Sequence, residues 1–92
     1  MLEVPLDERA LSRLRWRCRR GMLENDLILE RFLHRHGSIL TLGQVDCLNE
    51  LLELSDNDLL DLLLGKKALS QLGESLDRDA VREVLRMLRE YR

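Results

Sequence analysis

The sequence predicts an all-α fold, a single domain built as a small bundle of four to five helices. Leucine fills 24 of the 92 positions while β-branched residues are few, a composition that favours helix over sheet. Aromatic residues make up only 3% of the chain, so the core has to be aliphatic. A length of 92 residues suits one domain spanning 1–92, with no room for a deep catalytic cleft.

The first two helices are expected on either side of Gly21. Asp7 is expected to cap the first, and an apolar stripe carries that helix as far as Arg20; the stripe consists of Leu11, Leu14 and Cys18. Gly21 interrupts the pattern as the residue after a helix does. The second helix, residues 22–36, is expected to be the most buried, because its apolar set is broad: Leu23, Leu27, Ile28, Leu29, Phe32 and Leu33.

Side-chain caps predict the next two helices. Thr41 followed by Gln44 resembles a capping box, in which each side chain accepts a hydrogen bond from the other residue's backbone. The helix that it opens has an apolar face made of Val45, Leu48, Leu51 and Leu52. Ser55 begins a cluster of helix-start residues, and a short fourth helix is expected to run from there to Gly65.

The last third of the chain is expected to hold a loop and one helix. Residues 66–76 are predicted to form a loop, because Gly65 precedes the segment and Gly73 interrupts it. The C-terminal helix, residues 77–91, is expected to be capped by Asp77, and its stripe is Val81, Val84, Leu85, Leu88 and Tyr91.

Charge is unevenly distributed, although the formal net charge is only −2. The segment 9–20 contains no acid and six arginines: Arg9, Arg13, Arg15, Arg17, Arg19 and Arg20. The segment 37–65 contains no lysine or arginine and six acids. Such a dipolar molecule indicates directional docking onto a partner more than general binding of a polyanion.

The residues that carry catalytic or metal chemistry are sparse. We expect no catalytic residue, no metal site and no enzyme activity, because the sequence lacks nucleophile, phosphate-loop and metal-ligand patterns. His34 and His36 are expected to be solvated surface residues. Cys18 and Cys47 are expected to be free buried thiols in a reducing compartment, with a single disulfide as the alternative. No apolar run is long enough to span a membrane, so we expect a soluble, cytoplasmic protein without membrane insertion.

The most distinctive stretch is 16–26. Trp16 lies off the apolar stripe and among arginines, and a tryptophan–arginine cluster is the usual composition of a binding hot spot. A purely structural reading is also open: Gly21 ends a helix, Arg20 pairs with Glu24, and the acids favour the positive end of the next helix.

The run WRCRRGMLENDLIL, followed by Phe32, closely resembles the succinate dehydrogenase FAD assembly factor family of small helical proteins. The family's Arg-Gly-x-x-Glu signature is matched by Arg20, Gly21 and Glu24. A second run, LLELSDNDLLDLLLG, resembles the family's second block, with Leu62 where the family often has tryptophan. The core of the resemblance covers residues 11–65.

The resemblance implies an assembly factor. Family members bind the flavoprotein subunit of succinate dehydrogenase, and often that of fumarate reductase, and promote covalent attachment of FAD to it. The cofactor then belongs to the partner, and this chain is expected to act as a cytoplasmic bacterial monomer without a tightly bound cofactor. The resemblance also implies a set of partner-binding residues, here named the recognition edge: Arg13, Trp16, Arg19, Arg20, Gly21, Met22, Glu24 and Asp26.

Two other functions stay open at this point. The arginines of 9–20 are an electrostatic footprint suited to DNA or RNA, against which stand the net negative charge and the acidic segment 37–65. An antitoxin-like module that binds another small protein is the second alternative.

Overall fold

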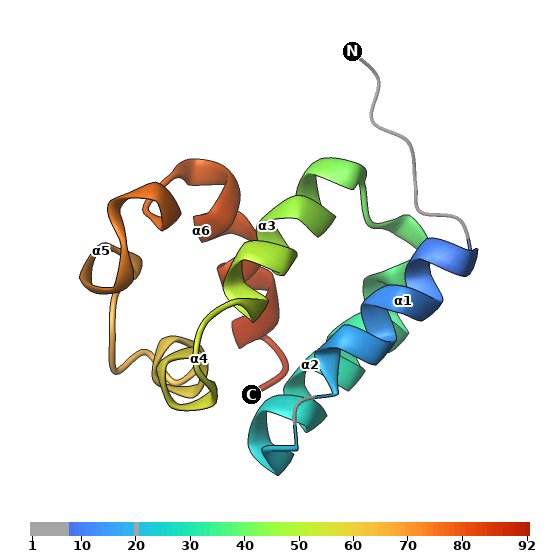
Figure 1. Ribbon diagram of the computed structural model, residues 1–92, viewed down its shortest axis with the longest axis horizontal. Coiled ribbons are helices and arrows are strands. Elements are labelled where there is room, and N and C mark those ends of the chain that lie inside the picture. The colour runs from blue at the N-terminus through green and yellow to red at the C-terminus, as the bar shows by residue number, and fades with distance from the viewer. Residues whose placement is uncertain (1–7, 20) are drawn as a thin grey trace.

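The computed structural model describes residues 8–19 and 21–92, and the fold of these residues is all-α, as predicted. The elements follow in the order α1 (Glu8–Cys18), α2 (Leu23–His36), the 3-10 helix η1 (Gly37–Ile39), α3 (Leu42–Leu52), α4 (Asp56–Leu63), α5 (Leu69–Leu72), the 3-10 helix η2 (Glu74–Leu76) and α6 (Asp79–Arg89). Helices α1 and α2 lie side by side along one side of the molecule (Figure 1). Helix α2 also packs against α4 and α6, and α3 packs against α6. Asp7, the expected cap of the first helix, lies outside the described residues.

Helix α2 is central, but the prediction of its buried face was partly wrong. The buried side chains recur at helical spacing and are Asn25, Ile28, Leu29, Phe32 and Leu33. Leu23 and Leu27, which were expected in this set, lie on the opposite face and are 66% and 39% exposed. The apolar residues of α2 cover more of its circumference than the surrounding helices can bury, so two leucines face outward.

The predicted caps of α3 and α4 are confirmed. The backbone N–H of Gln44 donates to Thr41 Oγ1 at 3.2 Å, and the N–H of Thr41 donates to Gln44 Oε1 at 3.0 Å. Ser55 Oγ accepts from the N–H of Asp58 at 3.2 Å at the start of α4. After α4 the backbone turns at Gly65, whose φ is +78°, a conformation that glycine adopts without strain.

The segment between α4 and α6 differs from the predicted loop, and the predicted cap of α6 was wrong. Residues 66–76 contain the short helices α5 and η2, because Leu69 and Leu76 bury their side chains in the core. Helix α6 begins at Asp79 without a side-chain cap. The carboxylate of Asp77 instead forms an ion pair with Arg82.

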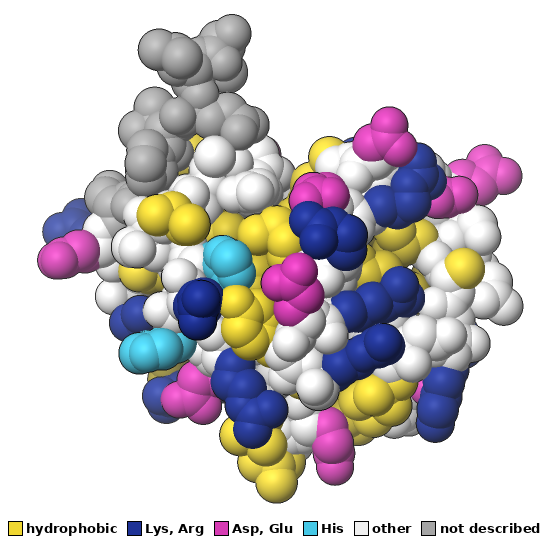
Figure 2. Space-filling view, turned by 180° about the vertical axis from the view of Figure 1, so that it is seen from behind, with side chains coloured by type: hydrophobic (Ala, Val, Ile, Leu, Met, Phe, Trp, Pro, Cys, Tyr) yellow, Lys and Arg dark blue, Asp and Glu magenta, His cyan; other side chains and the backbone are white. Residues whose placement is uncertain are grey.

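Arginines attach the C-terminal end of the chain to the rest of the fold. Arg89 donates from Nε and Nη2 to the carbonyl oxygen of Leu62, at 3.0 and 2.8 Å, and Arg92 donates to that of Leu63 at 3.1 Å. These carbonyls lie at the end of α4, and that of Leu62 also accepts from the N–H of Gly65 at 3.1 Å, so the arginine adds to the backbone hydrogen bonds that close this helix. On the face shown in Figure 2, basic and acidic side chains lie among one another. On α6, Arg86 forms ion pairs with Glu83 and Glu90.

The prediction that both histidines are solvated was wrong for His36. His34 is exposed, whereas His36 is half-buried and its Nε2 lies 2.8 Å from the hydroxyl oxygen of Tyr91. The rings of Phe32, His36 and Tyr91 contact one another. His36 therefore helps to join α2 to the C-terminal end of the chain.

The two cysteines are free and buried, as predicted. Burial raises the pKa of the Cys47 thiol, which disfavours the reactive thiolate. Within residues 8–19 and 21–92, no helix is long and apolar enough to cross a membrane.

One ion-pair cluster on α4 makes stability dependent on pH. Lys67 Nζ lies 2.8 Å from Asp58 Oδ1 and 3.5 Å from Asp61 Oδ2. The hydrogen bond between Lys67 and Asp58 lowers the pKa of Asp58 and raises that of Lys67. The stabilisation from Asp58 is therefore present at neutral pH and is lost as the pH falls through the carboxyl range. That from Lys67 is lost as the pH rises through the lysine range.

We expect Asp58→Asn to be less stable than the parent at about pH 7 and equally stable at about pH 2, below the lowered pKa of Asp58, where the parent carboxylate is itself protonated. Urea unfolding at both pH values measures the difference. Lys67→Met removes the other partner and should show the same loss at neutral pH. A stability difference that is unchanged at low pH would contradict the ion-pair explanation.

We expect Thr41→Ala to lower the free energy of unfolding by about 1 kcal/mol, because the variant leaves the N–H of Gln44 without its acceptor. Urea denaturation followed by circular dichroism measures this change. Thr41→Ser keeps the hydroxyl and is the matched control, which should remain close to the parent. An alanine variant as stable as the serine variant would show that the capping box contributes nothing.

Candidate functional site

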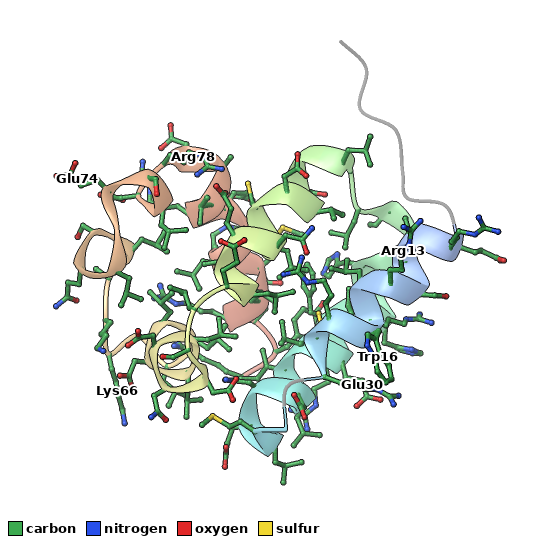
Figure 3. All side chains as sticks on the ribbon, viewed as in Figure 1. Arg13, Trp16, Glu30, Lys66, Glu74 and Arg78 are labelled. Atoms are coloured by element: carbon green, nitrogen blue, oxygen red, sulfur yellow. The ribbon has the colours of Figure 1, made fainter. Side chains whose placement is uncertain are left out.

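Two residues of the recognition edge, Arg13 and Trp16, lie on the outer face of α1, and Arg19 follows directly after the last residue of this helix. Arg13 and Trp16 are three residues apart, which places them within an arc of about 60° around the helix axis. This arc faces away from Leu14 and Cys18, the buried side chains of α1. All three are exposed, and Trp16 is 74% exposed (Figure 3). The fold thus leaves a large indole in solvent between two guanidinium groups.

The turn between α1 and α2 depends on Gly21. Its φ is +96°, in the region that residues with a side chain rarely adopt. A Cβ atom at this position would meet nothing within 4 Å, so packing within the chain does not require a glycine here. The glycine is needed for the backbone conformation, and the space beside its Cα is open to another molecule. Arg20, the preceding residue of the signature, lies outside the described residues.

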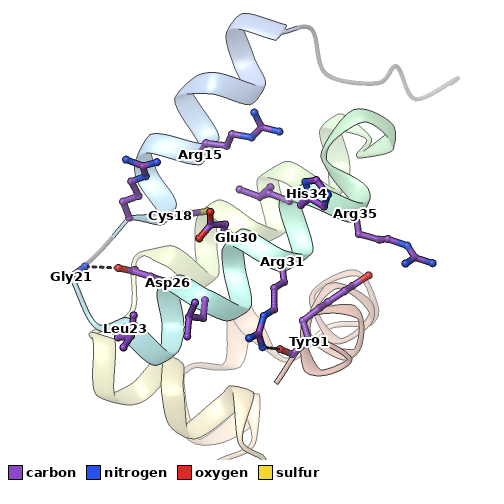
Figure 4. Close-up of a pocket in the computed structure, with 13 residues that line it drawn as sticks. Arg15, Cys18, Gly21, Leu23, Asp26, Glu30, Arg31, His34, Arg35 and Tyr91 are labelled. Carbon is purple, nitrogen blue, oxygen red and sulfur yellow. Dashed lines mark hydrogen bonds between the residues drawn. The ribbon is translucent and has the colours of Figure 1, made fainter.

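The first turn of α2 brings the remaining residues of the edge together. Met22 is half-buried and is the N-cap residue, without a side-chain cap. Glu24 is exposed and makes no hydrogen bond or ion pair with any described residue. Asp26 Oδ2 accepts a hydrogen bond from the N–H of Gly21 at 3.2 Å (Figure 4). Arg19 joins this cluster at the end of α1, whereas Arg13 lies about 9 Å further along the helix axis.

The structural reading of these residues also holds in part. Helix α1 ends at Cys18, short of the predicted end at Arg20, and Gly21 lies further along the connection, where it has a positive φ. Both Glu24 and Asp26 lie in the first turn of α2, where carboxylates are stabilised. The same residues therefore shape the turn and lie on its surface.

An open pocket borders the recognition edge. Its volume is about 1130 Å³, and it extends between α1 and α2 as far as the C-terminal end of the chain. The pocket includes Arg19, Gly21 and Asp26 of the edge, and its further lining includes Arg15, Leu23, Leu27, Glu30, Arg31 and Tyr91. Sites for small molecules usually measure about 300–1,000 Å³ and enclose most of the ligand. This wide, open surface suits contact with a macromolecule better.

Sequence reasoning missed three residues of this region. Leu23 and Leu27 were assigned to the core, yet they line the pocket. Asn25 was assigned no role, yet it is fully buried, and its Nδ2 donates to the carbonyl oxygen of Asp56 at 2.9 Å. The sequence contained a signal for all three residues. A buried stripe that continues from Phe32 toward the start of the helix at helical spacing includes position 25 and excludes positions 23 and 27.

The chemistry that this surface offers is binding. Guanidinium groups and a carboxylate can form charge-assisted hydrogen bonds, and the indole can bury a large apolar area. Among residues 8–19 and 21–92, no three His, Cys, Asp or Glu side chains are grouped so that they could hold a metal ion.

Comparison with known proteins identifies the family. A family model described as flavinator of succinate dehydrogenase matches residues 12–92, which extends beyond the core resemblance at 11–65. A protein of Ralstonia nicotianae named FAD assembly factor SdhE is 49% identical over 90% of this chain and 84% of its own length. Proteins with the same name from Coxiella burnetii and Legionella pneumophila strain Lens are 46% and 43% identical, over 61% and 65% of this chain and 68% and 76% of their own lengths. No solved structure matches the chain. The match over nearly the whole chain shows that this protein belongs to the family of succinate dehydrogenase flavinators.

Proposed function

We propose that this protein is an assembly factor that binds the flavoprotein subunit of succinate dehydrogenase and promotes covalent attachment of FAD to it. Membership of the flavinator family supports this function. The structural observation that carries the assignment to the recognition edge is Glu24. The side chain of Glu24 is exposed beside the open space at Gly21. It makes no hydrogen bond or ion pair with a described residue, so the described part of the fold does not require it.

The edge residues have distinct parts in this proposal. Trp16 inserts its indole into the partner as the main apolar anchor, and Arg13 and Arg19 form charged contacts around it. Gly21 lets a segment of the flavoprotein approach the turn closely. Glu24 accepts hydrogen bonds from the partner. Arg20 and Met22, the latter beside the turn, are included in this contact because the family resemblance implies them.

The exposed leucines of α2 extend the proposed contact. Leu23 and Leu27 are adjacent on the outer face of the helix, four residues apart, and border the same pocket as Arg19 and Gly21. Exposed apolar side chains beside arginines are typical of the central part of a protein–protein interface. We therefore include both leucines in the surface that contacts the flavoprotein.

The assembly factor acts by orientation, and the bond to FAD is made within the flavoprotein. Holding the mobile parts of the flavoprotein in one arrangement places its reactive histidine against the flavin. Such orientation accelerates reactions strongly, because the entropic cost of alignment is met by binding. In this proposal FAD remains bound to the partner, and the chain is not an enzyme in its own right.

The same edge is proposed to serve the flavoprotein of fumarate reductase. We propose that the protein acts as a monomer in the cytoplasm, a reducing compartment suited to its two free thiols.

We expect Glu24→Gln to lose most covalent flavinylation without a loss of stability, because the carboxylate is exposed and bonds to no described residue. Co-expression with the flavoprotein and in-gel fluorescence of covalent flavin measure activity, and urea unfolding measures stability. The matched control is Glu53→Gln, which changes an exposed glutamate at the end of α3 and should flavinylate normally. Normal flavinylation with Glu24→Gln would remove this carboxylate from the proposed contact.

Substitution of Gly21 separates its two roles. Asparagine tolerates a positive φ better than leucine does, so we expect Gly21→Asn to keep near-parental stability and Gly21→Leu to lose about 1 kcal/mol. Both variants should lose flavinylation, because each places a side chain in the open space beside the turn. A fully active and folded Gly21→Leu protein would contradict the proposed close approach.

We expect Trp16→Ala to weaken binding to the purified flavoprotein about tenfold or more, since an indole at a hot spot contributes at least about 1.4 kcal/mol. Isothermal titration calorimetry measures the affinity. Ile39→Ala is the matched control, because Ile39 is also exposed, at 65%, but lies at the opposite end of α2 from Gly21. Equal affinities of the two variants would contradict the role of Trp16 as an anchor.

A further inference from the structure

Three consecutive polar residues at the start of α2 have three different environments. Glu24 is exposed, Asn25 is 0% exposed, and Asp26 is half-buried. Of the three, Glu24 alone makes no hydrogen bond to another residue of 8–19 and 21–92. The other two side chains point toward the fold, which indicates a different role for each.

Asn25 joins the recognition edge to a distant part of the chain. Its Nδ2 donates to the carbonyl oxygen of Asp56, the first residue of α4, over 2.9 Å and 31 residues of sequence. Its Oδ1 is buried and has no hydrogen-bond partner among the described residues. Burying an unpaired carbonyl oxygen costs stability, and this cost offsets part of what the hydrogen bond to Asp56 contributes to folding. The side-chain amide of Asn25 therefore has its main effect on the position of α2, and its effect on stability is secondary.

Asp26 holds the turn itself. Met22, the N-cap residue of α2, has no side chain that could cap the helix. The carboxylate of Asp26 instead accepts from the N–H of Gly21, the residue whose φ is +96°. This hydrogen bond spans the connection between α1 and α2 and favours one conformation of it. The carboxylate faces its own chain, and this changes the role that the sequence assigned to it.

We propose that Asn25 and Asp26 are positioning residues of the recognition edge. Asn25 fixes the first turn of α2 against the start of α4, and Asp26 fixes the backbone of Gly21, so that the space beside Gly21 and the carboxylate of Glu24 have a set geometry before the flavoprotein binds. Contacts arranged before binding avoid the entropic cost of ordering the loop. The inference rests on the proposed function, because the edge is taken to be the contact with the flavoprotein.

The first test compares Asn25→Leu with Asn49→Leu. Asn49 is a matched control, because its Oδ1 also links two helices, accepting from Arg17 Nη1 at 2.8 Å, but it lies away from the turn. Unfolding free energy, affinity for the purified FAD-free flavoprotein and the rate of flavinylation are measured for both. We expect Asn25→Leu, compared at equal folded fraction, to bind about tenfold more weakly than the parent, while Asn49→Leu binds normally. Parental affinity and rate in Asn25→Leu would overturn the role of Asn25.

The second test does not depend on the stability of Asn25→Leu. Asp26→Asn keeps an acceptor oxygen for Gly21, and Asp26→Ala removes it. We expect the backbone amide resonance of Gly21 to shift and its hydrogen exchange to accelerate in the alanine variant, with a parallel loss of affinity, and both to be restored in the asparagine variant. A role in overall stability alone would leave the asparagine and alanine variants indistinguishable in affinity at equal folded fraction, and that result would overturn the inference.

Glu24→Gln distinguishes failure of the inference from failure of the proposed function. If Glu24→Gln loses flavinylation while Asn25→Leu and Asp26→Ala retain it, only the positioning role is wrong. If all three variants retain flavinylation, the recognition edge itself is misassigned.

Discussion

The reversal of the chain between Cys18 and Leu23 is the constraint on which the arrangement depends. Few residues separate α1 from α2, so the two helices must lie alongside each other, and the stripe of α1 is directed onto α2. Such a short connection needs a residue that accepts a positive φ, and Gly21 provides it. The turn then projects at one end of the helix pair. The fold thereby exposes this turn, which includes Gly21 and is followed by Glu24.

The rest of the molecule makes α2 a rigid support for this turn. Its buried face contacts α1, α4 and α6, and its far end is held through His36 and Tyr91. Arg89 and Arg92 secure the end of α6 to carbonyls of α4. Polar contacts between segments distant in sequence thus compensate for the scarcity of aromatic side chains in a leucine core, because leucines alone pack without fixing one register.

Features that depend on residues close together in the sequence were predicted correctly. The capping box at Thr41, the cap at Ser55 and the break at Gly21 each depend on neighbours within a few residues, so the helices were found near their true limits. The errors concern contacts with distant segments. Leu23 faces outward because no helix covers that side of α2, and Asp77 pairs with Arg82 where a cap was expected. Likewise, the exposed residues of the edge could be named from the sequence, whereas the buried Asn25 could not, because its partner Asp56 lies 31 positions away.

The composition of the exposed surface also bears on what kind of partner it fits. Arginine alone would suit a phosphate backbone as well as a protein, since either supplies anionic oxygens. Trp16 could stack on a nucleobase, but the aliphatic side chains of Leu23 and Leu27 have no planar face for stacking and gain most from burial in an apolar surface. Glu24, exposed beside the same turn, would repel phosphates and can accept hydrogen bonds from a protein. Together the leucines and this carboxylate favour a folded protein with a mixed apolar and charged surface over a polyanion.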